Sequence, residues 1–373
     1  MEATALQFLG RLCDSFGPSG FEREPGRIVK NYVQPFVDEV SSDKLGSLFF
    51  KKQGTAQSPV ILLPGHIDEV GFIVAGINKE GYLTFNPIGG WFDQVLLGQR
   101  VKVRTKDGTL LLGVIAAKPP HVLPPEERDK VVKKENMFID IGCANEPEVK
   151  KLGVRMGDPI VPDSTFSTMQ KTVFEEKEEK GVTTIAIGKG FDDRIGAFIA
   201  VEVLRRLRQE QIAHPNTVIA AATVQEEVGA RGARTTAHLL NPDVCLTLEV
   251  EIAGDVPGLD ATKAPAKMGK GPAIVTYDSS MIPNQPLKEL IIETAEQAKI
   301  PYQLSQVARG GTDGGIIHIS NAGCPTVVLG VATRHIHSHV GLLSLDDVEQ
   351  CINLVIAVIK RLDLETVRGL TEI

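Results

Sequence analysis

Short apolar runs alternate with amphipathic helical patterns along much of this chain, and this alternation constrains its fold more than any other feature. Apolar runs of strand length occupy residues 59–63, 183–187, 217–224, 244–250 and 325–331. Apolar side chains recur at helical spacing over residues 3–14, 192–209 and 286–298, and after Ser344, which we expect to cap a final helix. Strands that are apolar on both faces are buried between helices. The pattern therefore predicts an α/β fold with a mainly parallel, mixed sheet sandwiched by helices.

A different pattern interrupts this alternation between residues 71 and 165. Two extended runs flank Lys106-Asp107-Gly108 in segment 101–116, which is typical of a β-hairpin. Segments 81–91 and 136–143 also have strand character, and no helical pattern occurs between residues 72 and 165. The sequence thus predicts an all-β domain (71–165) inserted into an α/β domain made of residues 1–70 and 166–373.

Composition and charge exclude some classes of partner. The chain has 373 residues and a net charge of −7, with its positive residues scattered, so we expect no nucleic-acid partner. No apolar run approaches the ~20 residues that span a membrane, and the N-terminus lacks a basic leader. The five cysteines are far apart and most have apolar neighbours, which predicts free thiols. We therefore expect a cytoplasmic protein without a membrane partner.

Acidic residues and histidines follow the apolar runs where each predicted strand ends. In open α/β sheets, ligands bind outside the carboxyl ends of the strands. The residues at these positions are His66, Asp68, Asp192, Asp193, Arg194, Glu226, Glu227, Glu249, Glu251, Asp255, His335, His337 and His339. If the strands are neighbours, these side chains converge. Several carboxylates in one pocket would repel one another unless a positive charge lay among them.

A metal ion supplies that charge better than a side chain does. Arg194 is one candidate, but histidines among the acids favour zinc, cobalt or manganese, which imidazole nitrogen and carboxylate oxygen suit. The candidate ligands are too many for one tetrahedral ion, which favours a two-metal hydrolase site with ions ~3.5–4 Å apart. The adjacent Glu226 and Glu227 fit such a site. One can bind a metal while the other takes a proton from a water acidified by the metal.

An ordered set of motifs adds a family resemblance that covers nearly the whole chain. The motifs are SGFE (19–22), GHIDEVGF (65–72), AKPPH (117–121), FDDRIG (191–196), QEEVGARGA (225–233), EIAGDVPG (251–258), GGTDGG (310–315) and TRHIHSHVG (333–341). Together they resemble the dinuclear zinc or cobalt aminopeptidases of the glutamyl aminopeptidase and tetrahedral (TET) aminopeptidase type. Some members of this family carry the name endoglucanase. A single motif such as GGTDGG would be weak, whereas the ordered set is specific.

The resemblance implies a role for each matching residue near the first strand ends. It implies that His66 binds one metal and that Asp68 orients this histidine. Asp192 is expected to bridge the two metals. Glu226 is expected to be the general base, and Glu227 a metal ligand beside it.

The remaining ligands are implied by the later motifs. Glu249 and His337 are expected to complete the site at the second metal. Position 249 is commonly an aspartate in the family, and Glu251 competes for the role of Glu249. His335 and His339 are rivals of His337 by spacing, and the HSHVG sequence departs from an expected proline and glutamate.

The GGTDGG motif leaves two alternatives open. Gly311, Thr312 and Asp313 either line the substrate cleft or form a tight turn. We name these three residues as the candidate substrate-binding residues.

The activity that the resemblance implies is two-metal hydrolysis of N-terminal residues from peptides. It further implies a zinc-exopeptidase-like fold and two divalent ions per subunit, zinc first and cobalt or manganese as alternatives. Large homo-oligomers, often dodecamers, would assemble through the β-rich insert, which would serve as the dimerisation domain.

Three other classes of function compete with this reading. A metal-dependent amidohydrolase or carboxypeptidase would use similar metal chemistry without needing a free α-amino group. A glycoside hydrolase needs two carboxylates, usually in an aromatic-lined cleft, but this chain has one Trp and four Tyr. A non-catalytic protein built on a peptidase scaffold would have no need of Glu226.

Overall fold

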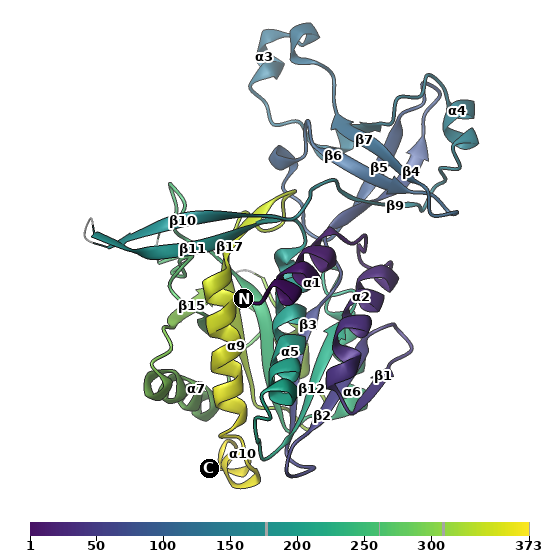
Figure 1. Cartoon of the computed structure of the whole chain (residues 1–373). Coiled ribbons are helices and arrows are strands. Elements are labelled where there is room, and N and C mark those ends of the chain that lie inside the picture. Colours follow the sequence, from purple (N-terminus) through teal and green to yellow (C-terminus); the bar gives the residue numbers. More distant parts are fainter. Residues whose placement is uncertain (176–177, 261, 308–309, 373) are drawn as a thin grey trace.

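The computed structural model describes residues 1–175, 178–260, 262–307 and 310–372. Their strands form one large open sheet and one small closed barrel (Figure 1). Helices cover both faces of the large sheet, which confirms the predicted α/β fold. No helix in these ranges is both long enough and apolar enough to cross a membrane. All five cysteines are free, and all but Cys143 are buried.

The centre of the large sheet is parallel. Strands β12 (Thr217–Thr223), β3 (Val60–His66), β13 (Val244–Ile252) and β16 (Thr326–Arg334) lie side by side in this order and pair in parallel. Nearly all of their residues are buried, as expected for strands that are apolar on both faces. Because the strands run the same way, their carboxyl ends meet at one edge of the sheet.

The flanks of the sheet are antiparallel. On one side lie β2 (Leu48–Gln53) and β1 (Glu39–Ser42), and on the other β17 (Gly341–Ser344), β11 (Glu178–Gly188) and β10 (Ser167–Glu175). Strand β14 (Ala273–Asp278) pairs with the first half of β16 and with β15 (Gln303–Val307). The sheet therefore forks at β16, and β14 on this branch is antiparallel to β16 but parallel to β15. The sequence did not predict β10, which projects with β11 as a two-stranded arm (Figure 1).

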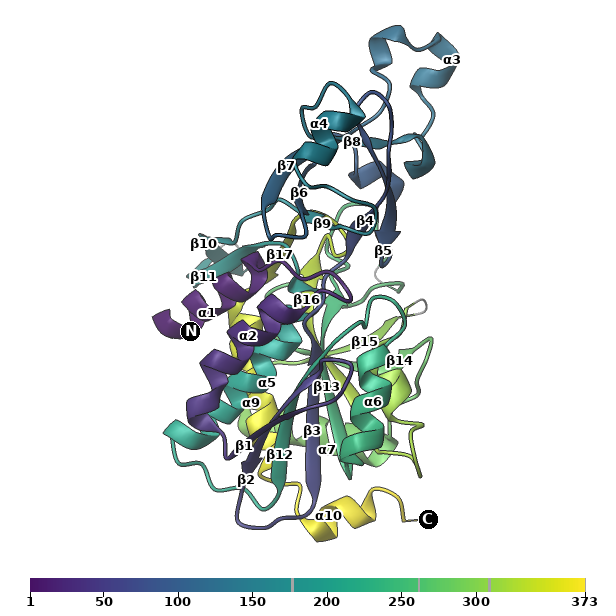
Figure 2. The ribbon, with the colours of Figure 1, turned by 90° about the vertical axis from the view of Figure 1, so that its right-hand side faces the viewer.

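Two helical layers enclose the sheet. One contains α1 (Ala3–Asp14), α2 (Arg23–Val33), α5 (Phe191–Gln209), α7 (Gln285–Ala298) and α9 (Leu345–Ile359), which share the largest core cluster. The other contains α6 (Arg231–Leu240) and α8 (Asp313–Ile317), which pack over a smaller core. Figure 2 shows α5 and α9 on one face of the sheet and α6 on the other.

The end of the chain differs from the prediction in two details. Ser344 stands at the N-cap position of α9 but makes no capping hydrogen bond. Its hydroxyl lies 3.3 Å from that of Thr183 instead. A further helix, α10 (Leu364–Gly369), follows α9 and is capped by Asp363.

The barrel is formed by the inserted segment. Its strands are β4 (Gly71–Ile77), β5 (Leu83–Ile88), β6 (Arg100–Arg104), β7 (Leu110–Ala116), β8 (Phe138–Asp140) and β9 (Pro159–Pro162). Strands β6 and β7 form the predicted hairpin. The barrel has a hydrophobic core of its own, in which Phe72 stacks on Trp91. Figure 1 shows the barrel beyond the end of the sheet to which β3 points.

Two short helices in the insert were not predicted. They are α3 (Pro125–Arg128) and α4 (Glu146–Lys151). The side chain of Asn145 caps α4 by accepting the N–H of Glu148. Val149 is the one buried residue of α4, so the helix has no apolar periodicity from which it could be predicted.

Candidate metal centre

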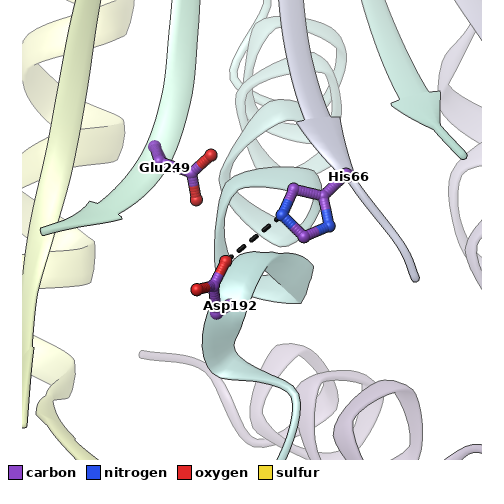
Figure 3. Close-up of side chains that lie close together, drawn as sticks. All are labelled: His66, Asp192 and Glu249. Carbon is purple, nitrogen blue, oxygen red and sulfur yellow. Dashed lines mark hydrogen bonds and ion pairs between the residues drawn. The ribbon is translucent and has the colours of Figure 1, made fainter. Parts of the chain in front are cut away.

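Three predicted ligands meet where β3, β13 and α5 come together. Figure 3 shows His66 at the end of β3, Glu249 on β13 and Asp192 in the first turn of α5. The Nε2 atom of His66 lies 3.2 Å from Oδ1 of Asp192. One ligand atom from each of the three residues lies within 4.8 Å of the others. The pairing of β13 with β3 brings Glu249 level with His66, because the register matches Val244 with Ile61.

A second group of ligand atoms shares Asp192 with the first. The Nε2 atom of His337 lies 3.1 Å from Oδ2 of Asp192 and 3.4 Å from Oε2 of Glu227. These three residues also offer atoms within 4.8 Å of one another. Asp192 therefore presents one oxygen to each group. The sequence analysis placed Glu249 with His337, but the structure groups Glu249 with His66 and Glu227 with His337.

Glu226 lies beside both groups without belonging to either. Its Oε2 atom is 3.7 Å from Nε2 of His66. Both Glu226 and Glu227 line a cavity of about 540 Å³ together with Asp192, Glu249 and His337. Glu227 thus belongs to the second group of ligand atoms, whereas Glu226 lies next to the first group without being part of it.

Asp68 fixes the segment that carries the glutamates. Its side chain is fully buried, with Oδ1 accepting the N–H of Glu226 at 3.1 Å and Oδ2 that of Glu227 at 3.2 Å. The Ser19 hydroxyl also donates to Oδ2, at 2.7 Å. Oδ1 lies 3.5 Å from Nδ1 of His66. Asp68 therefore couples the orientation of His66 to the position of both glutamates.

The two histidines of the site have raised pKa values because carboxylates surround them. Burial alone would lower the pKa of His66, but the carboxylates of Asp192 and Asp68 raise it well above its usual value. His337 behaves likewise, and the carboxylate of Asp192 raises its pKa to about 10.

The carboxyl groups show the complementary effect. Burial raises the pKa of Glu226 to about 9 and that of Glu227 to about 8. Burial and the adjacent Asp193 raise the pKa of Glu249 well above its usual value. Asp192 differs, because hydrogen bonds from His337 and His66 outweigh burial and hold its pKa below its usual value. The three raised glutamates indicate that the two histidines do not balance the acids, so a further positive charge nearby would stabilise their ionised forms.

Arg194 does not supply that charge. Its guanidinium is fully buried and lies 3.1 Å from the carboxylate of Glu69, which also accepts from Lys189 at 2.6 Å. The other partners of this guanidinium are the backbone carbonyls of Leu12, Cys13, Ser15, Gly17 and Ile67. Arg194 thus ties α1 and the segment after β3 together beneath the centre. The sequence analysis missed Glu69 and Lys189, since nothing in their local pattern marks them as partners.

Other residues around the site were also missed. Oε1 of Glu22 accepts the N–H of Gln225, and this hydrogen bond helps to hold the turn before Glu226. Gln225 has a φ of 56°, in the left-handed region. Gly90 of the insert approaches the centre so closely that a Cβ there would lie 3.0 Å from Nδ1 of His337. The Gly-Gly pair at 89–90 was the available sequence signal for this close approach.

The rivals of the predicted ligands belong to neither of the two ligand groups. His335 is exposed, whereas His339 is buried, with its ring centroid 5.3 Å from that of Trp91. Asp255 forms an ion pair with Arg334 at 2.6 Å. Glu251 lines another part of the same cavity.

The GGTDGG loop lines the cavity only in part. Gly311 and Thr312 are lining residues. Asp313, which we expected to bind substrate, lies behind the wall. It is buried, and its Oδ2 accepts the Thr223 hydroxyl at 2.5 Å. Asp313 is not among the described lining residues, so its expected role in binding substrate stays a prediction.

Comparison with known sequences gives a consistent result. A model of the M42 glutamyl aminopeptidase family matches residues 46–354. The FrvX protein of Escherichia coli (strain K12) is 36% identical over 367 residues, which cover 98% of each chain. The glutamyl aminopeptidase of Lactococcus lactis is 31% identical over 351 residues, 94% of each chain. The lysyl aminopeptidase of Pyrococcus furiosus is 30% identical over 360 residues, 95% of this chain and 97% of that one.

Solved structures agree with the sequence comparison. The TET aminopeptidase of the marine sediment archaeon Thaumarchaeota archaeon SCGC AB-539-E09 has a TM-score of 0.93 at 59% identity, covering 99% of both chains. The PhTET1-12s dodecamer has a TM-score of 0.81 at 29% identity, covering 97% of this chain and 100% of that one. An endoglucanase from Thermotoga maritima has a TM-score of 0.74 at 28% identity, covering 97% and 99%.

Proposed function

Because the chain belongs to the M42 glutamyl aminopeptidase family, we propose that it removes N-terminal residues from peptides at a centre for two divalent metal ions. Membership of this family and likeness to aminopeptidases make the chain a peptide hydrolase. The observation that carries the finer proposal is the pair of ligand groups that share Asp192, with Glu226 free beside them.

The residues present fit a pair of divalent cations. One ion would be held by His66, Asp192 and Glu249, and the other by Asp192, Glu227 and His337. Oε1 of Glu227 is buried without a hydrogen-bond partner in the described part of the chain, as expected of an oxygen that would bind a cation. The mixture of imidazole and carboxylate suits zinc best, with cobalt or manganese as alternatives.

Glu226 has the position of a general base. Divalent ions bound in the two groups would supply Lewis acidity to a water molecule and to the scissile carbonyl. Glu226 faces the same space, so we infer that its carboxylate takes a proton from the attacking water and returns it to the leaving amine. A nearby cation would lower the raised pKa of Glu226 and keep it ionised for the first of these transfers.

The lining of the cavity favours this activity over hydrolysis of a glycosidic bond. Sugar-binding clefts usually have aromatic walls. The described residues that line this cavity include no Phe, Tyr or Trp. Acetylation of the substrate's amino group distinguishes the other rivals, since it should stop an aminopeptidase but not an amidohydrolase that acts on acylated substrates.

The substitution Glu226→Gln tests the proposal. We expect the variant to retain its metal and to lose ~10²- to 10⁴-fold in kcat on an aminoacyl anilide, which is the usual contribution of a general base. Metal content is measured by elemental analysis of the same sample. The matched control is Glu289→Gln, which removes a carboxylate from an exposed position on α7. Wild-type kcat in the Glu226→Gln variant would refute the assignment of the base.

We further propose that segment 71–165 is the assembly domain of a homo-oligomer. The PhTET1-12s relative is a dodecamer, and the barrel here presents an apolar stripe. Leu110, Leu112 and Val114 alternate along β7 and are 48%, 56% and 41% exposed. Three exposed apolar side chains on one face of a strand favour contact with another protein surface. Light scattering tests the proposal, and a monomer under all conditions would contradict it.

A further inference from the structure

The cavity is lined in part by residues that the proposed reaction does not use. Four of them are apolar: Ile252 of β13, Val275 of β14, Val328 of β16 and Ile336. Two further carboxylates, Glu251 and Asp278, also line the cavity. We call these six residues the side pocket.

The two carboxylates of the side pocket are buried, and that of Asp278 is incompletely satisfied. Glu251 and Asp278 are 2% and 3% exposed. Oδ1 of Asp278 is held by the N–H and the hydroxyl of Ser280, both at 2.6 Å. Oδ2 is buried and has no hydrogen-bond partner among the described residues. An unpaired carboxylate oxygen in a buried wall is costly unless a ligand reaches it.

Glu251 and Asp278 place two carboxyl groups in the wall of one cavity, and a cation there would stabilise their ionised forms. Oε1 of Glu251 accepts the N–H of Ile252 at 3.1 Å, which orients the carboxylate without neutralising it. A cation with several N–H donors would also satisfy the free oxygen of Asp278.

The side pocket stands at a defined distance from the proposed reaction centre. Glu251 follows the proposed ligand Glu249 by two residues on β13, and two residues of a strand span ~7 Å. That distance is similar to the reach of an extended lysine side chain. Val275 and Val328 line the same cavity and offer apolar surface to the methylenes of such a chain.

We propose that the side pocket receives the side chain of the substrate's N-terminal residue and selects a cationic one, lysine or arginine. This inference rests on the proposed aminopeptidase function and names its substrate class. The methylenes pack against the valines, and the ammonium or guanidinium group donates to Asp278 and Glu251. A glutamyl side chain would bring a third carboxylate into the pocket. A neutral chain would leave Oδ2 of Asp278 buried without a donor.

A panel of aminoacyl anilides tests the inference on the metal-loaded, full-length protein. We expect kcat/KM for lysyl and arginyl anilides to exceed that for the norleucyl anilide by ~10- to 100-fold, as one or two hydrogen bonds to a charged group allow. Norleucine is the informative comparison because it keeps the methylenes and lacks the charge. The glutamyl anilide should be the poorest substrate of the panel.

Substitutions in the pocket separate recognition from a merely structural role. In Asp278→Asn and in Glu251→Gln, the ratio of lysyl to norleucyl kcat/KM should fall toward one. A structural defect would lower both values together and leave the ratio unchanged. The Glu289→Gln control removes an exposed carboxylate and should keep the wild-type ratio.

The outcomes distinguish failure of the inference from failure of the proposed function. If no aminoacyl anilide is cleaved by protein that contains metal, the proposed function itself is wrong. If norleucyl, leucyl or glutamyl anilides are cleaved as well as the lysyl anilide, the inference alone is overturned. It is also overturned if both pocket variants keep the wild-type ratio.

Discussion

The substitution Asp68→Asn should weaken metal binding without removing any proposed ligand. Both oxygens of Asp68 accept backbone N–H groups, one from Glu226 at 3.1 Å and one from Glu227 at 3.2 Å. An asparagine has one accepting oxygen, so its NH₂ group must face one of these N–H donors in either orientation. The variant therefore loses a charge-assisted hydrogen bond and gains a contact between two donors.

The size of the effect follows from these contacts. A hydrogen bond to a charged group contributes ~1.5–3 kcal/mol, which corresponds to a ~10- to 150-fold change in an equilibrium constant. The usual cost of altering a partner behind a metal ligand, ~10- to 100-fold in affinity or activity, falls in the same range. We therefore expect metal affinity, measured by competition with a chelator, to fall by one to two orders of magnitude.

A matched control exists elsewhere in the chain. Asp347 is 2% exposed and accepts the N–H groups of Gly269 at 2.6 Å and Gly271 at 2.8 Å. Asp347→Asn creates the same conflict between donors away from the cavity lining. It should cost a similar amount of stability in urea unfolding and leave metal affinity unchanged. Wild-type metal affinity in Asp68→Asn, or an equal loss in Asp347→Asn, would refute this reasoning.

Two further predictions concern the inserted barrel. Gly90→Ala places a Cβ 3.0 Å from Nδ1 of His337 and, by displacing that ring, should lower kcat/KM ~10-fold or more. In the control Gly369→Ala the added Cβ meets no atom within 4 Å, so kcat/KM in the same assay should not change. Leu112→Glu puts a charge into the exposed apolar stripe of β7 and should reduce the particle mass measured by light scattering. The control Leu239→Glu, at an exposed position on α6, should leave the mass unchanged. An unchanged mass for Leu112→Glu would exclude this face from the assembly contact.

The sequence predicted those parts of the fold that depend on local burial. Strand β12 is buried at every position, so its apolar run identified it directly. Strand β10 was missed because its sequence, STMQKTVFE, lacks such a run. Helix α4 was missed because Val149 alone is buried. Both elements are defined by pairing or capping, and neither leaves a periodic apolar pattern.

For the candidate site, the sequence likewise identified residues but did not predict their arrangement. Polar residues after apolar strands are visible in the sequence, and they led to His66, Asp192 and Glu249. Which of them face one another depends on strand order, and the placement of β13 beside β3 brings Glu249 to His66. That order is set by long-range packing, and the family resemblance placed Glu249 with His337, whereas the structure groups it with His66.

Anomalous diffraction at the zinc edge, from crystals of the zinc-loaded protein, tests the central claim most directly. We predict two peaks per chain, one among His66, Asp192 and Glu249 and the other among Asp192, Glu227 and His337. A single peak, or peaks outside these two groups, would contradict the proposed two-metal centre.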